Sequence, residues 1–289
     1  MQILLQSHPL LLLAGCFVFS LLVGSFLNVV IYRLPLMMQR EWKTECRLIL
    51  ELDETDEHKT PFNLAVPGSH CPVCNTAIKP WQNIPIVSYL LLKGRCAHCS
   101  TPISIRYPIV EGVTAILSVL VAWKFGATPQ TLAGLVFTWC LISLTMIDAD
   151  HKLLPDQITL PLLWAGILVN SFGLFVPLQD AVWGAIGGYL SLWSVYWLFK
   201  ILTGKEGMGF GDFKLLAALG AWMGWQHLLL IILLSSLVGA VVGSIILAVN
   251  KQGRNTTIPF GPYLAAAGWI AFLWGDQIIQ AYLQFSGMK

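Results

Sequence analysis

Charged residues are scarce in this chain. Asp, Glu, Lys and Arg make up 11% of its 289 residues, whereas soluble domains carry about 25%. The hydrophobic share is 56% and the mean hydropathy is +0.70. These values exclude an ordinary soluble domain and predict a protein that crosses a membrane several times. The net charge of +2 gives no reason to expect a nucleic-acid partner.

The first nine residues contain neither Lys nor Arg. A secretory signal peptide normally begins with a basic region, so the lipoprotein-like box LLLAGC that ends at Cys16 is not interpreted as a cleavage site. The apolar run also continues beyond Cys16 to about Ile31. We therefore expect a retained first membrane helix.

Long apolar runs are abundant. A membrane-spanning helix needs roughly 20 mainly apolar residues, and about eight such runs occur, of which the sixth is short: 10–32, 108–124, 130–149, 157–176, 181–202, 213–226, 227–249 and 259–284. We expect an all-α polytopic membrane protein with about eight transmembrane helices. Its predicted parts are a first helix (1–32), a polar loop (33–107) and a membrane core of seven helices (108–289).

Basic residues are distributed unevenly between the predicted loops. With the N-terminus outside, every one of the 17 Lys and Arg residues except Lys124 and Lys289 falls on the cytoplasmic side. An excess of Lys and Arg in cytoplasmic loops is the usual rule for membrane proteins. The pattern therefore predicts a cytoplasmic loop at 33–107 and both termini on the outer side.

Four of the seven cysteines form two C-x2-C pairs, CPVC and CAHC, inside this polar loop: Cys71, Cys74, Cys96 and Cys99. Two such pairs about twenty residues apart are typical of a structural zinc site with four thiolates. A redox pair or two disulfides are the alternatives, but cytoplasmic thiols stay reduced. The loop is therefore predicted to contain a small zinc knuckle.

Two aspartates stand out at the ends of predicted spans. Ionisable residues within spans are costly and are functional candidates. Asp148 ends the third span and Asp212 begins the sixth, and alternating helix directions place both at the inner membrane edge. Two carboxylates that share a proton can activate water and polarise a carbonyl, as in aspartic proteases. The pattern predicts a catalytic aspartate pair.

Helix ends suggest different roles for the two aspartates. Asp148 lies near a helix C-terminus, which disfavours a negative charge, and Asp212 lies near a helix N-terminus, which favours one. We therefore expect the shared proton on Asp148 and the base at Asp212.

Two further acidic residues have structural interpretations. Asp156 follows Pro155 and is expected to cap the fourth span. Glu111 begins the second span, and we expect it to pair with Arg33 or Arg106, because acids within membranes usually have a partner. The alternative is that it lines the path of a substrate.

The segment GMGFGDFK contains Asp212 and three glycines. A phosphate-binding loop is disfavoured, because no strand precedes the segment and an aspartate at the helix start repels anions. A plain turn between helices remains an alternative. Glycines also let a second backbone approach closely, which an extended peptide substrate requires.

These residues resemble the bifunctional type IV prepilin peptidase and N-methyltransferase family over nearly the whole chain. The resemblance rests on the paired C-x2-C motifs and on four segments: GSFLNVVIYRLP, RYPIVE, IDADHKLLPD and GMGFGDFK. The last two match the D-x6-P and GxGD elements of the family, and GxGD also resembles that of the presenilin and signal peptide peptidase proteases.

The resemblance implies a multi-pass protein of the bacterial inner membrane. Such a protein cleaves the leader from prepilins and pseudopilins at the cytoplasmic face, then methylates the new N-terminal residue with S-adenosylmethionine. By motif match, Asp148 and Asp212 are the peptidase residues, and the four cysteines bind zinc. Gly94 and Arg95, in LKGRC, match the segment linked to methyl transfer. No nucleotide-binding fingerprint supports the methyltransferase independently of the resemblance.

Two functions of other classes fit parts of the pattern. A proton-coupled transporter with a zinc-stabilised loop would use carboxylates as a relay, and its charges would lie near the middle of the membrane. A catalytically silent assembly protein would not need the aspartates. Because the candidate carboxylates cluster at one membrane edge, the protease is favoured over the transporter.

Overall fold

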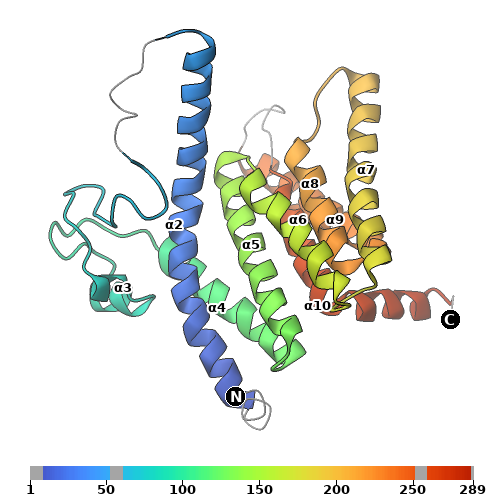
Figure 1. Ribbon diagram of the computed structural model, residues 1–289, viewed down its shortest axis with the longest axis horizontal. Coiled ribbons are helices and arrows are strands. Elements are labelled where there is room, and N and C mark those ends of the chain that lie inside the picture. The colour runs from blue at the N-terminus through green and yellow to red at the C-terminus, as the bar shows by residue number, and fades with distance from the viewer. Residues whose placement is uncertain (1–8, 53–60, 251–258, 288–289) are drawn as a thin grey trace. The chain divides into compact units, whose positions relative to one another are not determined.

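The computed structural model describes residues 9–52, 61–250 and 259–287 (Figure 1). These residues are mostly helical, and within them β-structure is limited to two isolated bridges. They form two compact units, Met1–Ala127 and Thr128–Lys289. The predicted all-α class is confirmed for the described residues.

The first unit is built on two helices that pack against each other, α2 (Pro9–Ile49) and α4 (Arg106–Phe125) (Figure 1). At 1.5 Å per residue, the 41 residues of α2 extend about 60 Å, roughly twice the 30 Å of a bilayer core. The helix thus continues well past the predicted membrane boundary at residue 32. The described part of the loop between α2 and α4 contains two short helices, η2 (Pro80–Asn83) and α3 (Val87–Leu91).

In its described residues, 128–250 and 259–287, the second unit has six helices and one short 3-10 turn: α5 (Pro129–His151), α6 (Asp156–Ser171), α7 (Leu178–Thr203), α8 (Phe210–Met223), η3 (Trp225–His227), α9 (Leu228–Asn250) and α10 (Gly261–Phe285). Helix α8 lies beside α6 and α7 (Figure 1) and also contacts α10. From Asp212 to Met223 every residue of α8 except Lys214 is buried, so α8 is the core helix of this unit.

Helix α8 is attached to its neighbours by close contacts. Gly184 of α7 and Gly220 of α8 face each other so closely that a Cβ atom on either would overlap the carbonyl oxygen of the other. On the opposite side, the indole of Trp222 donates to the carbonyl of Leu162 in α6 at 2.8 Å, and Asn170 donates to the carbonyl of Ala221 at 2.9 Å. These contacts fix the position of α8, and therefore of Asp212 at its start.

In the described residues, five helical segments are long and apolar enough to cross a membrane: α2, α4, α5, α7 and Trp225–Ile245. Eight spans were expected. Helices α6 and α8 have 16 and 14 residues, fewer than the roughly 20 that a perpendicular span needs. The polytopic membrane character is thus supported, and the count of eight is not confirmed.

Candidate active site and metal centre

Asp148 lies in the last turn of α5, where the backbone ends the helix without a glycine. Lys152 adopts the left-handed conformation (φ 54°, ψ 43°), and its N–H donates to the carbonyl of Asp148 at 2.9 Å. The Asp148 side chain is 5% exposed. Its Oδ2 atom accepts a hydrogen bond of 3.0 Å from the backbone N–H of Gly261, the first residue of α10.

Asp212 lies in the first turn of α8, after the N-cap residue Gly209. Its N–H donates to the Gly209 carbonyl at 3.2 Å, and its side chain is 7% exposed. The carboxylates of Asp148 and Asp212 interact electrostatically, although they belong to different helices and sequence motifs. The packing of the second unit therefore brings the two sequence-predicted aspartates together.

The surroundings of Asp148 differ from the expectation based on helix ends. Asp148 is indeed at the C-terminus of α5, but its carboxylate also faces the N-terminus of α10 through Gly261. Both aspartates therefore lie at the positive end of a helix dipole. The helix dipoles therefore do not distinguish which of the two aspartates holds the shared proton.

Asp156 has a different partner from the one expected. The N-cap of α6 is Pro155, and Asp156 is the first residue of the helix, so the prediction that Asp156 caps α6 is wrong. Both of its carboxylate oxygens instead accept hydrogen bonds of 2.7 Å from Lys214 of α8. The ion pair joins the IDADHKLLPD and GMGFGDFK segments.

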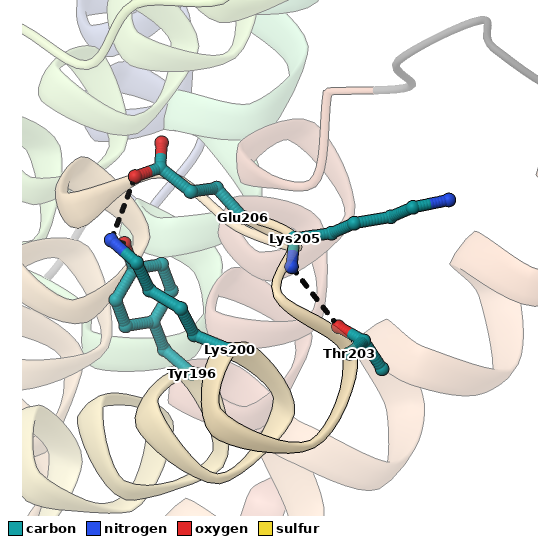
Figure 2. Close-up of polar contacts among 5 residues, drawn as sticks. All are labelled: Tyr196, Lys200, Thr203, Lys205 and Glu206. Carbon is teal, nitrogen blue, oxygen red and sulfur yellow. Dashed lines mark hydrogen bonds and ion pairs between the residues drawn. The ribbon is translucent and has the colours of Figure 1, made fainter.

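The loop that leads into Gly209 is attached to the end of α7. Figure 2 shows Lys200 donating both to the hydroxyl of Tyr196, at 3.2 Å, and to the carboxylate of Glu206, at 2.9 Å. The hydrogen bond from Lys200 lowers the pKa of Glu206 below its usual range. The Tyr196 ring also packs against Phe213, the residue after Asp212, with 5.6 Å between ring centroids.

The four cysteines of the first unit form one cluster, made by two similar turns. In the first turn, the N–H of Cys71 donates to the carbonyl of Thr76, and in the second the N–H of Cys96 donates to that of Thr101. Each turn is closed by an isolated bridge, His70 to Ala77 and Arg95 to Pro102. The repeated sequence pattern C-x2-C-x-T therefore produces the same turn twice.

The sulfur positions fit a tetrahedral zinc ion. The four Sγ atoms lie within 4.8 Å of one another, and Cys71 and Cys99 are 3.7 Å apart. Zinc–sulfur bonds of about 2.3 Å in a tetrahedron require about 3.8 Å between sulfurs. All four cysteines are free thiols, which excludes the two-disulfide alternative in this structure. The four residues would hold a structural zinc.

Threonine side chains favour the thiolate form that a metal requires. Hydrogen bonding with Thr76, at 3.3 Å, lowers the pKa of Cys74. Hydrogen bonding with Thr101, at 3.2 Å, lowers the pKa of Cys99 to about 6. Since zinc binds the deprotonated thiol, these two threonines are candidate functional residues that the sequence analysis did not name. Their matching positions, two residues after a cysteine in both turns, were the available signal.

Gly94 and Arg95 connect α3 to the second cysteine turn. Gly94 has a φ of +67°, which favours glycine, and a Cβ there would meet the end of the Tyr89 side chain, 2.9 Å from its hydroxyl. Arg95 is exposed. The positive φ accounts for glycine at position 94. Arg95 has an accessible side chain beside the cysteine cluster.

Glu111 is buried in α4 and holds the loop before α3. Its Oε2 atom accepts the N–H of Ile86 at 2.8 Å, and Ile86 has an unusual φ of +58°. The expected partner Arg33 instead donates to loop carbonyls, among them that of Pro67 at 2.6 Å. A structural role for Glu111 is thus supported through a backbone amide, and the pairing with Arg33 is wrong.

Comparison with known proteins covers both units. Residues 18–125 match the bacterial peptidase A24 N-terminal domain, and residues 135–244 match the type IV leader peptidase family. The prepilin leader peptidase/N-methyltransferase of Pseudomonas aeruginosa is 59% identical, with 99% of this chain and 98% of the relative covered. The protein of the same name from Aeromonas hydrophila is 58% identical, with 97% of each chain covered. The one from Legionella pneumophila is 48% identical, with 98% of each chain covered. No solved structure matches. The chain therefore belongs to the type IV leader peptidase family, among the prepilin leader peptidase/N-methyltransferases.

Proposed function

We propose that this chain removes the leader peptide from type IV prepilins and pseudopilins and then methylates the new N-terminal residue. The observation that supports the peptidase most directly is the meeting of two buried carboxylates, Asp148 and Asp212, in the second unit. They come from two motifs that are far apart in the sequence, and they interact because helices α5, α8 and α10 pack together.

The proposed cleavage is general acid–base catalysis by this pair. One carboxylate accepts a proton from water, which attacks the scissile carbonyl carbon, while the protonated partner donates to the carbonyl oxygen. The proton gained by the base then goes to the leaving amine, and the C–N bond breaks. As the carbonyl re-forms, one hydroxyl of the intermediate returns a proton to the second carboxylate. Burial of both side chains strengthens their mutual interaction, because the local dielectric constant is low.

The proposed methyl transfer belongs to the first unit. S-Adenosylmethionine bound there would supply an electrophilic methyl group to the α-amine freed by cleavage, which then loses a proton, and S-adenosylhomocysteine would be the leaving group. We assign Gly94 and Arg95 to cofactor binding, supported by their place directly before Cys96. The zinc site formed by the four cysteines would hold this segment in its fold, since closed four-cysteine sites are structural.

The proposed topology follows from the charge distribution. We propose eight spans in the bacterial inner membrane, with both termini periplasmic and the loop of residues 33–107 cytoplasmic. Residues 1–32 would form the first span and residues 108–289 the seven-span peptidase core. The positive-inside bias of Lys and Arg supports this orientation. It places the aspartate pair at the cytoplasmic face.

The test is mass spectrometry of a purified prepilin after incubation with the purified protein and S-adenosylmethionine, which measures cleavage and methylation together. Asp148→Asn and Asp212→Asn should each lower the rate of cleavage by about 10²- to 10⁴-fold. Asp150→Asn, two residues from Asp148 and exposed, is the matched control and should cleave normally. Normal cleavage by both dyad variants would exclude the proposed mechanism.

A further inference from the structure

The first residue of α10 contacts the aspartate pair, although it lies 113 positions after Asp148. The N–H of Gly261 donates to Asp148 Oδ2 at 3.0 Å, and this hydrogen bond is buried. At the start of a helix the first N–H groups have no partner within the helix. Asp148 therefore satisfies a free donor of α10, and α10 in turn holds one oxygen of the Asp148 carboxylate.

Position 261 has no space for a side chain. A Cβ atom there would lie 2.6 Å from Asp148 Oδ2 and 3.2 Å from Leu154 Cδ1. Real Cβ atoms essentially never approach another heavy atom within 3.0 Å. Any residue other than glycine at 261 would therefore displace the Asp148 carboxylate or move the start of α10.

Leu154 links this contact to the second aspartate. Its side chain is 8% exposed, and a Cβ added to Gly211, the residue before Asp212, would lie 2.8 Å from the Cβ of Leu154. Leu154 therefore packs against Gly211 at the start of α8 and against Gly261 at the start of α10. One side chain fixes the distance between the two helix starts that hold the aspartates.

We propose that Gly261 is a positioning residue for the aspartate pair. Its N–H orients the Asp148 carboxylate, and its missing side chain lets that carboxylate approach Asp212 with Leu154 as the spacer. This inference rests on the proposed peptidase function. Gly261 acts through Asp148 and takes no part in proton transfer.

The first test is the cleavage kinetics of Gly261→Ala with a purified prepilin. Displacing a reacting group by about 1 Å costs on the order of 10²-fold in rate, so kcat should fall by about that factor while KM changes less than about threefold. Gly187→Ala is the control, because its Cβ would meet only the end of the Leu228 side chain, at 3.2 Å. An unchanged kcat for Gly261→Ala, with Asp148→Asn inactive, would overturn the inference and leave the peptidase function standing. Full activity of Asp148→Asn would instead overturn the function itself.

A second test separates positioning from packing. The midpoint of thermal unfolding is measured for Gly261→Ala in two backgrounds, with Asp148 present and with Asp148→Ala. Residues in direct contact are not additive in such cycles. If the new methyl group collides with the Asp148 carboxylate, the loss in Tm should be less than half as large once that carboxylate is removed. Equal losses in both backgrounds would assign Gly261 to general packing and reject the proposal.

Discussion

The cysteine cluster and the aspartate pair differ in how the chain assembles them. The cysteines come from two short turns, residues 71–77 and 96–102, each closed by its own backbone hydrogen bonds. The aspartates come from α5 and α8, and a third helix, α10, holds one of them. The first site needs two local turns and a metal ion, whereas the second needs a correctly packed helical unit.

This difference predicts that the two sites fail separately. Loss of the metal should disturb the loop between α2 and α4, because a structural zinc contributes folding free energy only to the segment that binds it. A defect in helix packing around α8 should instead disturb the aspartates.

The largest effect is expected when leader cleavage and methylation are both measured for a variant at each site. Asp212→Asn should lower the rate of leader cleavage by about 10²- to 10⁴-fold, the usual contribution of a general acid or base. It should leave methylation of a pre-cleaved pilin peptide within about twofold, because the side chain lies in the second unit. Both rates are measured by mass spectrometry with S-adenosylmethionine.

Cys96→Ser is the corresponding variant at the cysteine cluster, and the opposite result is expected. It removes one zinc ligand, so bound zinc should fall below about one ion per chain and methylation should be lost while cleavage continues. Zinc is measured by atomic emission, with Cys140→Ser in α5 as a matched cysteine control that should keep its zinc. Loss of both cleavage and methylation in either variant, Asp212→Asn or Cys96→Ser, would show that the two sites are not independent.

Helix packing around α8 should give the next largest effect. Gly220→Leu inserts a side chain where even a Cβ would overlap the carbonyl of Gly184, and overpacking of this kind costs about 3 kcal/mol. The thermal midpoint in detergent should fall and cleavage with it, while bound zinc stays at the wild-type level. A stable variant with full cleavage would show that the α7–α8 contact is not required for the aspartate site.

The sequence predicted what depends on spacing or on helix direction. The C-x2-C pairs indicated four cysteines in one cluster, because such pairs form local turns that ligand spacing describes. The meeting of Asp148 and Asp212 followed from alternating helix directions. The spacing of the cysteines and the direction of successive helices both follow from the order of residues along the chain.

The sequence did not predict contacts set by packing between distant helices. Nothing in the sequence pattern linked Gly261 to Asp148, because that contact depends on where α10 begins in space. The cap assigned to Asp156 was wrong for a similar reason. A local rule for helix starts favoured a cap, whereas the lysine that binds Asp156 comes from α8, 58 residues later.

The ion pair between Asp156 and Lys214 should contribute less than the buried contacts. Its side chains are 51% and 29% exposed, and exposed pairs contribute about 0.2–1 kcal/mol. Lys214→Met should therefore reduce cleavage by less than about threefold, and the exchange variant Asp156→Lys with Lys214→Asp should restore part of the loss. A much larger loss that the exchange does not restore would assign Lys214 a role in the reaction itself.

The smallest effect is expected at Glu206, which anchors the loop before Gly209. Because Lys200 lowers the pKa of Glu206 in the folded protein, the carboxylate stabilises the fold above its ordinary pKa of 4.5. This stabilisation is lost as the pH falls through the lowered value. Glu206→Gln should thus lower the thermal midpoint slightly at pH 7, and the difference from wild type should shrink below about pH 4. A difference that stays constant from pH 7 to pH 3 would show that the substitution acts independently of the charge on Glu206, which would reject the ion pair as its cause.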